Sequence, residues 1–113
     1  MKKKNIIKSS MEFTEIIHKC PYKKNNYYIV YSRKNDTWNR FGISVPTKTG
    51  KAHDRNKIKR RIKNIIDLYE KQMHNSRDYV IIVRKRLVEL DYQQMEVQLI
   101  DLLKKIGEKD EAK

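Results

Sequence analysis

A continuous apolar run, DYVIIV over Asp78–Val83, constrains the fold more than any other segment of the sequence. Because its apolar residues do not alternate with polar ones, the run is typical of a strand buried within a sheet. Two further segments, Asn26–Arg33 and Phe41–Pro46, are rich in aromatic and β-branched residues and also predict strands. Asn35 and Asp36 predict the turn between these two strands.

Three segments with helical periodicity accompany the strands. A capping box formed by Ser9 and Glu12 predicts the start of a first helix, and Pro21 lies just beyond its end. A long second helix is predicted over residues 54–73, and a last helix follows a second capping box, formed by Asp91 and Gln94. The apolar faces of the three helices contain, in order, Phe13, Ile16, Ile17 and Cys20; then Ile58, Ile62, Ile65, Ile66 and Tyr69; then Tyr92, Met95, Leu99, Leu102, Leu103 and Ile106.

The order of these elements predicts a single-domain α+β sandwich over residues 1–113. The predicted order is α-β-β-α-β-α, with an optional third strand before the second helix, and helices pack on an open, mostly antiparallel sheet. Residues 1–8 are expected to form a flexible basic arm, and residues 107–113 a frayed tail. No apolar run reaches membrane-spanning length. The single cysteine, Cys20, cannot form an internal disulfide, so we expect a cytoplasmic protein.

The positive charge of the chain is concentrated in its first half. The net charge is +13, but residues 1–63 hold 18 Lys and Arg against four acidic residues, whereas residues 64–113 hold nine against ten. Solubility alone does not require such an uneven distribution, although a plainly solvated surface is the simplest alternative. The concentration favours a polyanionic partner, either nucleic acid or an acidic membrane surface.

The segment Arg55–Lys63 carries the densest charge, with six basic residues among nine. Ile58 and Ile62 anchor it to the core, so its basic side chains are held facing solvent. Like charges four residues apart on a helix repel each other, and a polyphosphate chain would relieve that repulsion. The segment therefore predicts a nucleic-acid contact without indicating which kind.

The sequence lacks the residue patterns that a protein catalyst needs. His18, His53 and His74 are scattered, with no spacing that places two on one helix face as metal ligands. There is no glycine-rich phosphate loop, and capping and salt-bridge roles account for Glu12 and Glu15. If the protein takes part in catalysis, the chemistry belongs to another molecule.

The segment GISVPTKTGKAHDRNKIKRRIKNI resembles the signature of the bacterial ribonuclease P protein subunit. In that family a Gly-x-Ser-Val strand leads through a Lys-x-x-Gly-x-Ala loop into an Arg-Asn-Arg helix. The matching residues are Gly42, Ser44, Val45, Lys48, Gly50, Ala52, Arg55, Asn56, Lys59 and Arg60. The resemblance extends over nearly the whole chain. It departs from the family at Lys57 and Lys63, which replace arginines, and at Ile17, where phenylalanine is common.

The resemblance implies an accessory subunit of the enzyme that removes the 5′ leader from precursor tRNA. The active site would lie in an RNA subunit that uses Mg²⁺, and the protein would have no catalytic residues, metal or cofactor. The helix would bind the catalytic RNA, and a cleft between the first helix and the sheet would hold the single-stranded leader and broaden the substrate range. The residues implied for the catalytic RNA are Lys48, Lys51, Arg55, Asn56, Lys57, Lys59, Arg60 and Lys63, and those implied for the leader are Phe13, Ile17, Ile29 and Tyr31.

The same resemblance implies a left-handed crossover from the strand ending at Pro46, through the basic helix, to Asp78–Val83. It implies no membrane and no obligate protein partner, and polyvalent anions are expected to bind the free protein. The sequence is also compatible with two alternatives: a general RNA-binding or ribosome-associated module, and a protein-only nuclease. Plain core packing is the alternative for Phe13 and Tyr31.

Overall fold

The computed structural model describes residues 1–73 and 76–111, with side chains described through residue 107. Seven helices and strands follow one another in the order α-β-β-β-α-β-α; three strands precede the second helix, and the one outside the predicted strand segments is the short β1, directly after α1. Their bounds are α1 (Ser10–Lys19), β1 (Tyr22–Lys24), β2 (Tyr28–Lys34), β3 (Arg40–Ser44), α2 (Ala52–Tyr69), β4 (Arg77–Val83) and α3 (Tyr92–Glu111). Short 3-10 helices lie at η1 (Lys3–Asn5), η2 (Thr47–Thr49), η3 (Glu70–Gln72) and η4 (Lys85–Glu89).

The four strands form one open sheet in the order β1-β2-β4-β3. β2 pairs antiparallel with both β1 and β4, and β3 pairs parallel with β4. The apolar run of β4 thus lies inside the sheet between two neighbours, and six of its seven residues are buried. This placement confirms the prediction that Asp78–Val83 is a buried strand.

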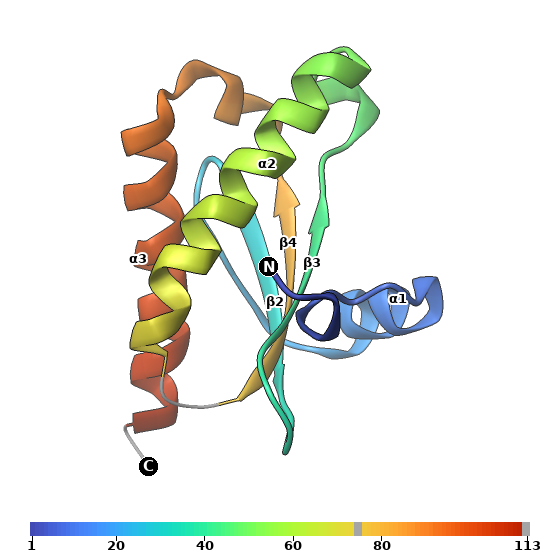
Figure 1. The fold of residues 1–113 in the computed structure, drawn as a ribbon, viewed down its shortest axis with the longest axis vertical. Coiled ribbons are helices and arrows are strands. Elements are labelled where there is room, and N and C mark those ends of the chain that lie inside the picture. Colours follow the sequence, from blue (N-terminus) through green and yellow to red (C-terminus); the bar gives the residue numbers. More distant parts are fainter. Residues whose placement is uncertain (74–75, 112–113) are drawn as a thin grey trace.

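Helices cover both faces of the sheet. α2 and α3 pack on one face, where Tyr28 and Val30 of β2 belong to the larger core cluster with residues of both helices. α1 packs on the other face, where Ile16 and Val80 belong to a smaller cluster. Because side chains of a strand alternate between faces, the two clusters draw on alternate residues of β2 and β4. Figure 1 shows α1 apart from the α2–α3 layer.

The crossover between β3 and β4 has the rare hand. The two strands are parallel neighbours, and α2 carries the chain from one to the other. In Figure 1 both arrows point upward, α2 lies in front of the sheet, and β4 lies to the left of β3, which makes the crossover left-handed. Parallel crossovers are right-handed in nearly all proteins. The expectation that the family resemblance implied is confirmed.

The chain ends differ from the prediction. The flexible arm expected over residues 1–8 is instead docked: Ile7 is buried, its backbone N–H donates to the carbonyl of Phe41 at 3.0 Å, and Ile6 forms a parallel bridge with Phe41. The reason is that the segment contains two isoleucines, and these lie against the free edge of β3.

At the other end of the chain, α3 continues to Glu111, beyond the predicted end at residue 106. A single interior glycine, Gly107, does not end the helix, because it costs only about 1 kcal/mol. Residues 112–113 lie outside the described residues.

Side-chain caps start α1 and α3 where the sequence predicts them. The Ser9 hydroxyl accepts the Glu12 backbone N–H at 3.3 Å. At α3 the box is reciprocal, because Asp91 accepts the Gln94 N–H at 2.8 Å and Gln94 accepts the Asp91 N–H at 3.0 Å. These caps satisfy backbone donors that have no partner inside the helix.

Candidate nucleic-acid interface

The exposed side of α2 and the loop before it form the first candidate surface, which we call the basic surface. Ile62, Ile65 and Ile66 are fully buried, and this anchors the helix with its opposite side in solvent. The eight residues predicted to contact RNA all lie on this surface: Arg55 is half-buried, and Lys48, Lys51, Asn56, Lys57, Lys59, Arg60 and Lys63 are exposed. The structure thus places the predicted set along one helix and its leading loop.

Local contacts hold the start of the basic surface in place. The Arg55 side chain donates from Nε to the carbonyl of Gly50 at 3.2 Å, which ties the helix to the loop. Lys51 is the N-cap residue of α2 and supplies no side-chain cap. The first-turn N–H groups and the positive end of the helix dipole therefore add to the charge of Lys48 and Lys51, with Asp54 as the acidic residue of that turn. The geometry can hold an anionic group at the loop and a phosphate chain along the helix.

The second candidate surface lies under α1 on the opposite face of the sheet. Phe13 and Ile17 of α1 and Tyr31 of β2 are half-buried and pack against Ile16 and Val80. Ile29 is half-buried on the same face of β2, two residues before Tyr31. The structure thus brings the four residues predicted for the leader cleft to one side of the sheet, from two elements.

Three residues beyond the four predicted for the leader also belong to this surface. The Tyr22 ring lies 5.3 Å from the Tyr31 ring, and half of Tyr22 is exposed. Ile82, directly opposite Ile29 in the sheet, and Cys20 are half-buried with the same cluster. We name the set Phe13, Ile17, Cys20, Tyr22, Ile29, Tyr31 and Ile82 the apolar strip. Only the strand register makes these residues neighbours, because β1 is short and fully exposed and its sequence, Tyr22-Lys23-Lys24, has no apolar alternation that would predict a strand.

The apolar strip ends close to the loop of the basic surface. The row formed by Ile29 and Ile82 continues to Ser44, which pairs with Ile82 and is the last residue of β3. The chain enters the loop of Lys48 and Lys51 a few residues later. Lys24 stands at the other end of the row, opposite Ile29. An extended chain lying along this row would therefore meet positive charge at both ends.

Gly42 allows α1 to approach the sheet. A Cβ atom built on Gly42 would lie 2.6 Å from Cε2 and 2.9 Å from Cδ2 of Phe13, and both distances are too short for nonbonded carbons. The absence of a side chain at this position therefore sets how closely Phe13 lies to β3. Any larger residue must displace the ring.

A network of charged side chains fastens α1 to the sheet. Asp78 is buried and accepts hydrogen bonds from Arg40, Arg33 and Asn35 at 2.7–2.9 Å. Arg40 also pairs with Glu12 at 2.6 Å, and Arg33 with Glu15 at 3.0 Å. The salt-bridge role that the sequence indicated for Glu12 and Glu15 is confirmed.

This network shifts the pKa values of its members. Burial by itself raises the pKa of Asp78, but the hydrogen bonds from Arg40, Arg33 and Asn35 outweigh it, and the pKa is lowered. The hydrogen bond to Asp78 is the largest cause that raises the pKa of Arg40 and of Arg33. All three groups are charged at neutral pH, so α1 is held by ion pairs as well as by its apolar face.

The described residues contain neither a metal-binding cluster nor a membrane-spanning helix. In residues 1–73 and 76–111 no group of three or more His, Cys, Asp or Glu could hold a metal ion. His74 lies outside this part of the chain. No helix within the same part is long and apolar enough to cross a membrane.

Comparisons with known proteins agree with this geometry. The family model for ribonuclease P matches residues 1–107. The "Ribonuclease P protein component" of Mycoplasma mycoides is 40% identical over 108 residues, covering 94% of this chain and 99% of the relative, and that of Mesoplasma florum is 42% identical over 105 residues, covering 91% and 96%.

Solved structures show the same fold. A Staphylococcus aureus RNase P protein mutant with defective mRNA degradation activity superposes with a TM-score of 0.84 at 31% identity, covering 90% of this chain and 87% of that one. The RNase P protein from Thermotoga maritima superposes with a TM-score of 0.78 at 34% identity, covering 83% and 90%.

The fold and the two surfaces define a small basic α+β protein with its charge on one helix and an apolar strip on the far side of the sheet. The chain belongs to the bacterial ribonuclease P protein family. Members of this family are the accessory protein component of a tRNA-processing ribonucleoprotein enzyme, so the chain has an RNA partner.

Proposed function

We propose that this protein binds the catalytic RNA of ribonuclease P through the basic surface and the 5′ leader of precursor tRNA along the apolar strip. The observation that carries the proposal is the position of the strip, whose half-buried side chains run across the sheet from Lys24 to the loop of Lys48 and Lys51. A single strand seated there would place its bases on the strip and its phosphates near lysines at both ends.

The basic surface supports the contact with the catalytic RNA. Within the described residues, Lys57, Lys59, Arg60 and Lys63 form no ion pair, so their charge is available to a partner. Folded RNA presents phosphates along a helix groove, and a rigid row of basic side chains can neutralise several of them. Lys57 and Lys63 supply point charges where arginine would supply a planar pair of donors.

The apolar strip supports the contact with the leader. Tyr22 and Tyr31 offer ring surfaces on which unpaired bases can stack, and Lys24 lies 6.0 Å from the centre of the Tyr22 ring. Stacking tolerates any base, because every base has a flat face. The strip would therefore hold leaders of many sequences, which agrees with a role in broadening the substrate range.

The chemistry in this proposal belongs to the RNA subunit. Mg²⁺ bound to that RNA would supply the metal-ion chemistry of the cleavage, and no residue of this chain takes part in it in this proposal. This chain positions the leader and offsets the repulsion between two RNAs. Such work takes place in the bacterial cytoplasm, where precursor tRNA is made.

A cleavage assay with and without the protein tests the proposal. A bacterial catalytic RNA at low Mg²⁺ should cleave precursor tRNA faster when the protein is added, and the gain should grow with leader length until the strip is filled. Protein alone, purified free of RNA, should give no cleavage. Cleavage by the protein alone would support a protein nuclease, and a protein without effect on the catalytic RNA would support a general RNA-binding module.

A further inference from the structure

Trp38, the single tryptophan of the chain, lies in the turn between β2 and β3, outside both candidate surfaces. Its indole N–H donates to the carbonyl of Lys4 at 2.8 Å, and Nζ of Lys4 lies 5.0 Å from the centre of the ring. Asn35 holds the turn by donating to the carbonyl of Trp38 at 3.0 Å. The ring is thus fixed in orientation, although Trp38 is 43% exposed. A fixed, exposed ring is a surface on which a base can stack.

A hollow of about 540 Å³ lies beside the Trp38 ring. The N-terminal segment, the end of α2 and the start of η3 contribute its other lining residues, which are Met1, Lys2, Lys4, Asn5, Asp67 and Glu70. Asn5 donates to the carbonyl of Asn39 at 2.6 Å, which fastens the segment beside the turn of Trp38. The hollow is therefore built from parts of the chain that the fold holds together.

The charges around the hollow nearly balance. The amino group of Met1 lies 2.9 Å from Oδ2 of Asp67, so these two charges neutralise each other. Lys2, Lys4 and Glu70 remain, and neither Lys2 nor Glu70 forms an ion pair within residues 1–73 and 76–111. A phosphate group would leave the Glu70 carboxylate unused. An unpaired nucleobase fits better, because it has a flat face, no net charge, and both donors and acceptors at its edges.

The hollow continues the basic surface toward the end of α2. Lys63 of the basic surface lies one helical turn before Asp67, on the same side of the helix. The apolar strip, in contrast, lies under α1 on the opposite face of the sheet. An RNA bound along the basic surface would therefore reach the hollow, whereas a leader on the apolar strip would not.

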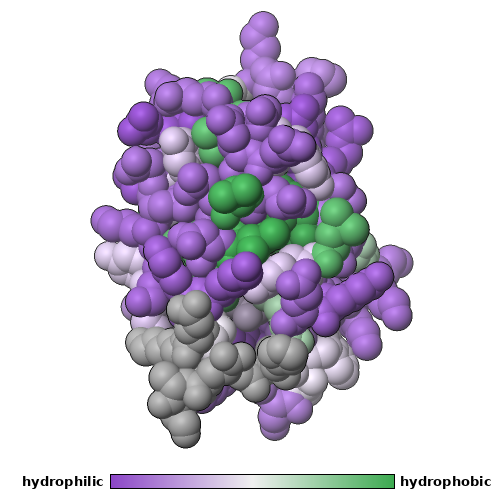
Figure 2. All heavy atoms as spheres, turned by 90° about the vertical axis from the view of Figure 1, so that its left-hand side faces the viewer, coloured by the Kyte–Doolittle hydropathy of each residue, from purple (hydrophilic) through white to green (hydrophobic). Residues whose placement is uncertain are grey.

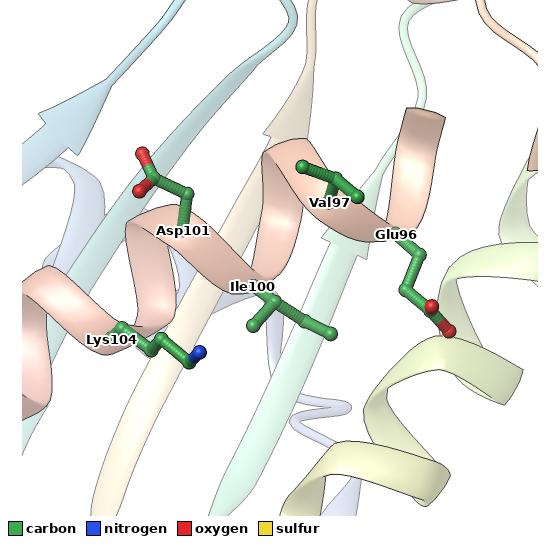
Figure 3. Close-up of a pocket in the computed structure, with 5 residues that line it drawn as sticks. All are labelled: Glu96, Val97, Ile100, Asp101 and Lys104. Carbon is green, nitrogen blue, oxygen red and sulfur yellow. The ribbon is translucent and has the colours of Figure 1, made fainter. Parts of the chain in front are cut away.

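The hollow on α3 lacks these features. Figure 3 shows its lining residues, which are Glu96, Val97, Ile100, Asp101 and Lys104. None of them carries an aromatic ring, and Figure 2 shows apolar atoms among polar ones on this side of the molecule. This side of α3 offers no ring on which a base could stack.

We infer that Trp38 stacks on an unpaired base of the catalytic RNA, with Lys2, Lys4 and Glu70 around the edges of that base. The inference rests on the proposed function, in which the basic surface binds this RNA. Stacking of an uncharged base releases no counterions, so this contact adds affinity without adding salt dependence. It thus differs from the contacts of the basic surface in a property that can be measured.

The fluorescence of the wild-type protein tests the stacking directly. Because Trp38 is the single tryptophan, selective excitation of tryptophan reports on the hollow alone. Titration with a bacterial catalytic RNA should quench the emission, with the same dissociation constant as assembly of the ribonucleoprotein. Addition of precursor tRNA to the assembled complex should change the emission little, because the leader lies on the other face of the sheet.

Binding of the same RNA by variants separates stacking from a structural role. Trp38→Ala should raise the dissociation constant by about tenfold and leave the slope of log affinity against log salt unchanged. Trp38→Phe loses the N–H that binds the carbonyl of Lys4 but keeps a ring, and it should retain most of the affinity. Val88→Ala, which truncates an exposed apolar residue of η4, is the control and should bind like wild type.

The outcomes distinguish this inference from the proposed function. Quenching that is absent although the RNA binds in a way that depends on Arg60, or a Trp38→Ala variant that binds like wild type, would overturn the inference and leave the proposed function intact. A Trp38→Phe variant that loses as much affinity as Trp38→Ala would show that Trp38 only fastens the N-terminal segment, and would also overturn it. Wild type that does not bind the catalytic RNA would overturn both.

Discussion

At the scale of single residues, Tyr31 is the side chain on which the leader proposal depends most. Tyr31→Ala removes one ring of the Tyr22–Tyr31 pair and should weaken binding of precursor tRNA by about 1–3 kcal/mol. Mature tRNA has no leader, so its affinity should change little. Tyr31→Phe keeps the ring and is the control. Direct binding of both tRNAs to the assembled ribonucleoprotein measures the effect, and an equal loss for both would show that Tyr31 is only structural.

Arg60 is exposed on the basic surface, away from the buried isoleucines of α2. Arg60→Ala should leave the stability of the protein unchanged and weaken its assembly with the catalytic RNA. The slope of log affinity against log salt should become shallower by about 0.7–0.9, the value for one lost phosphate contact. Arg86→Ala, in η4, serves as the control. The prediction fails if the Arg60 variant is destabilised but, once folded, assembles with the wild-type salt dependence.

Asp78 links the stability of the protein to pH. The pKa of Asp78 is lowered in the folded state. Its contribution to the free energy of unfolding is therefore fully present above the unfolded pKa of about 3.9 and is lost as the pH falls through the folded pKa. Asp78→Asn should destabilise the protein by about 3 kcal/mol at pH 7, because Arg33 and Arg40 lose their buried partner. The difference in the free energy of unfolding between wild type and this variant should become smaller as the pH is lowered toward 3.

Urea unfolding at pH 7 and pH 3 measures the Asp78 effect, and Asp36→Asn in the exposed turn is the matched control. A difference between wild type and the Asp78 variant that is as large at pH 3 as at pH 7 would contradict the assignment. The loss would then come from altered packing rather than from the lost charge.

At the scale of elements, the position of α1 depends on Gly42. Gly42→Ala forces the Phe13 ring away from β3 and should destabilise the protein by about 1–3 kcal/mol, the usual cost of overpacking. Gly107→Ala meets no atom within 4 Å and should stabilise α3 by roughly 0.5–1 kcal/mol. The midpoint temperatures of thermal unfolding of the two variants should therefore shift in opposite directions from that of wild type. A Gly42 variant as stable as wild type would mean that α1 moves away from the sheet at little cost.

At the scale of the whole molecule, the concentrated charge predicts stabilisation by polyvalent anions. At about 0.01 M salt the screening length is roughly 30 Å, comparable to the 40 × 29 × 25 Å extent of the protein, so the basic residues repel one another across the fold. An anion that binds only the folded form adds about 2.7 kcal/mol at a hundredfold excess over its dissociation constant.

Unfolding in sulfate and in chloride at equal ionic strength measures this effect. The midpoint should be higher in sulfate, and Lys51→Ala at the start of α2 should reduce the difference, because the loop and the first turn supply the donors. Identical unfolding midpoints in the two salts would show that sulfate does not bind a specific site and that salt acts on stability only by screening the charges.

Local sequence patterns predict the three helices, three of the four strands and the charge of the second helix, whereas the short, exposed β1 has no such pattern. The capping boxes at Ser9 and Asp91, the isoleucine periodicity of α2 and the apolar run of β4 are local patterns, and a local pattern specifies a helix or a strand wherever the chain is placed. The eight basic-surface residues could be predicted for the same reason, because they occupy one helix and the loop that leads into it.

Contacts between residues far apart in the sequence are known only from the folded chain. The docking of Ile7 on Phe41, the contact of Tyr22 with Tyr31, and the convergence of Arg33 and Arg40 on Asp78 each depend on strand register. Register follows from competition among long-range contacts, which no short window of sequence contains. The hand of the crossover is of the same kind: the general rule favours the right hand, and the left-handed path was expected only through the family resemblance.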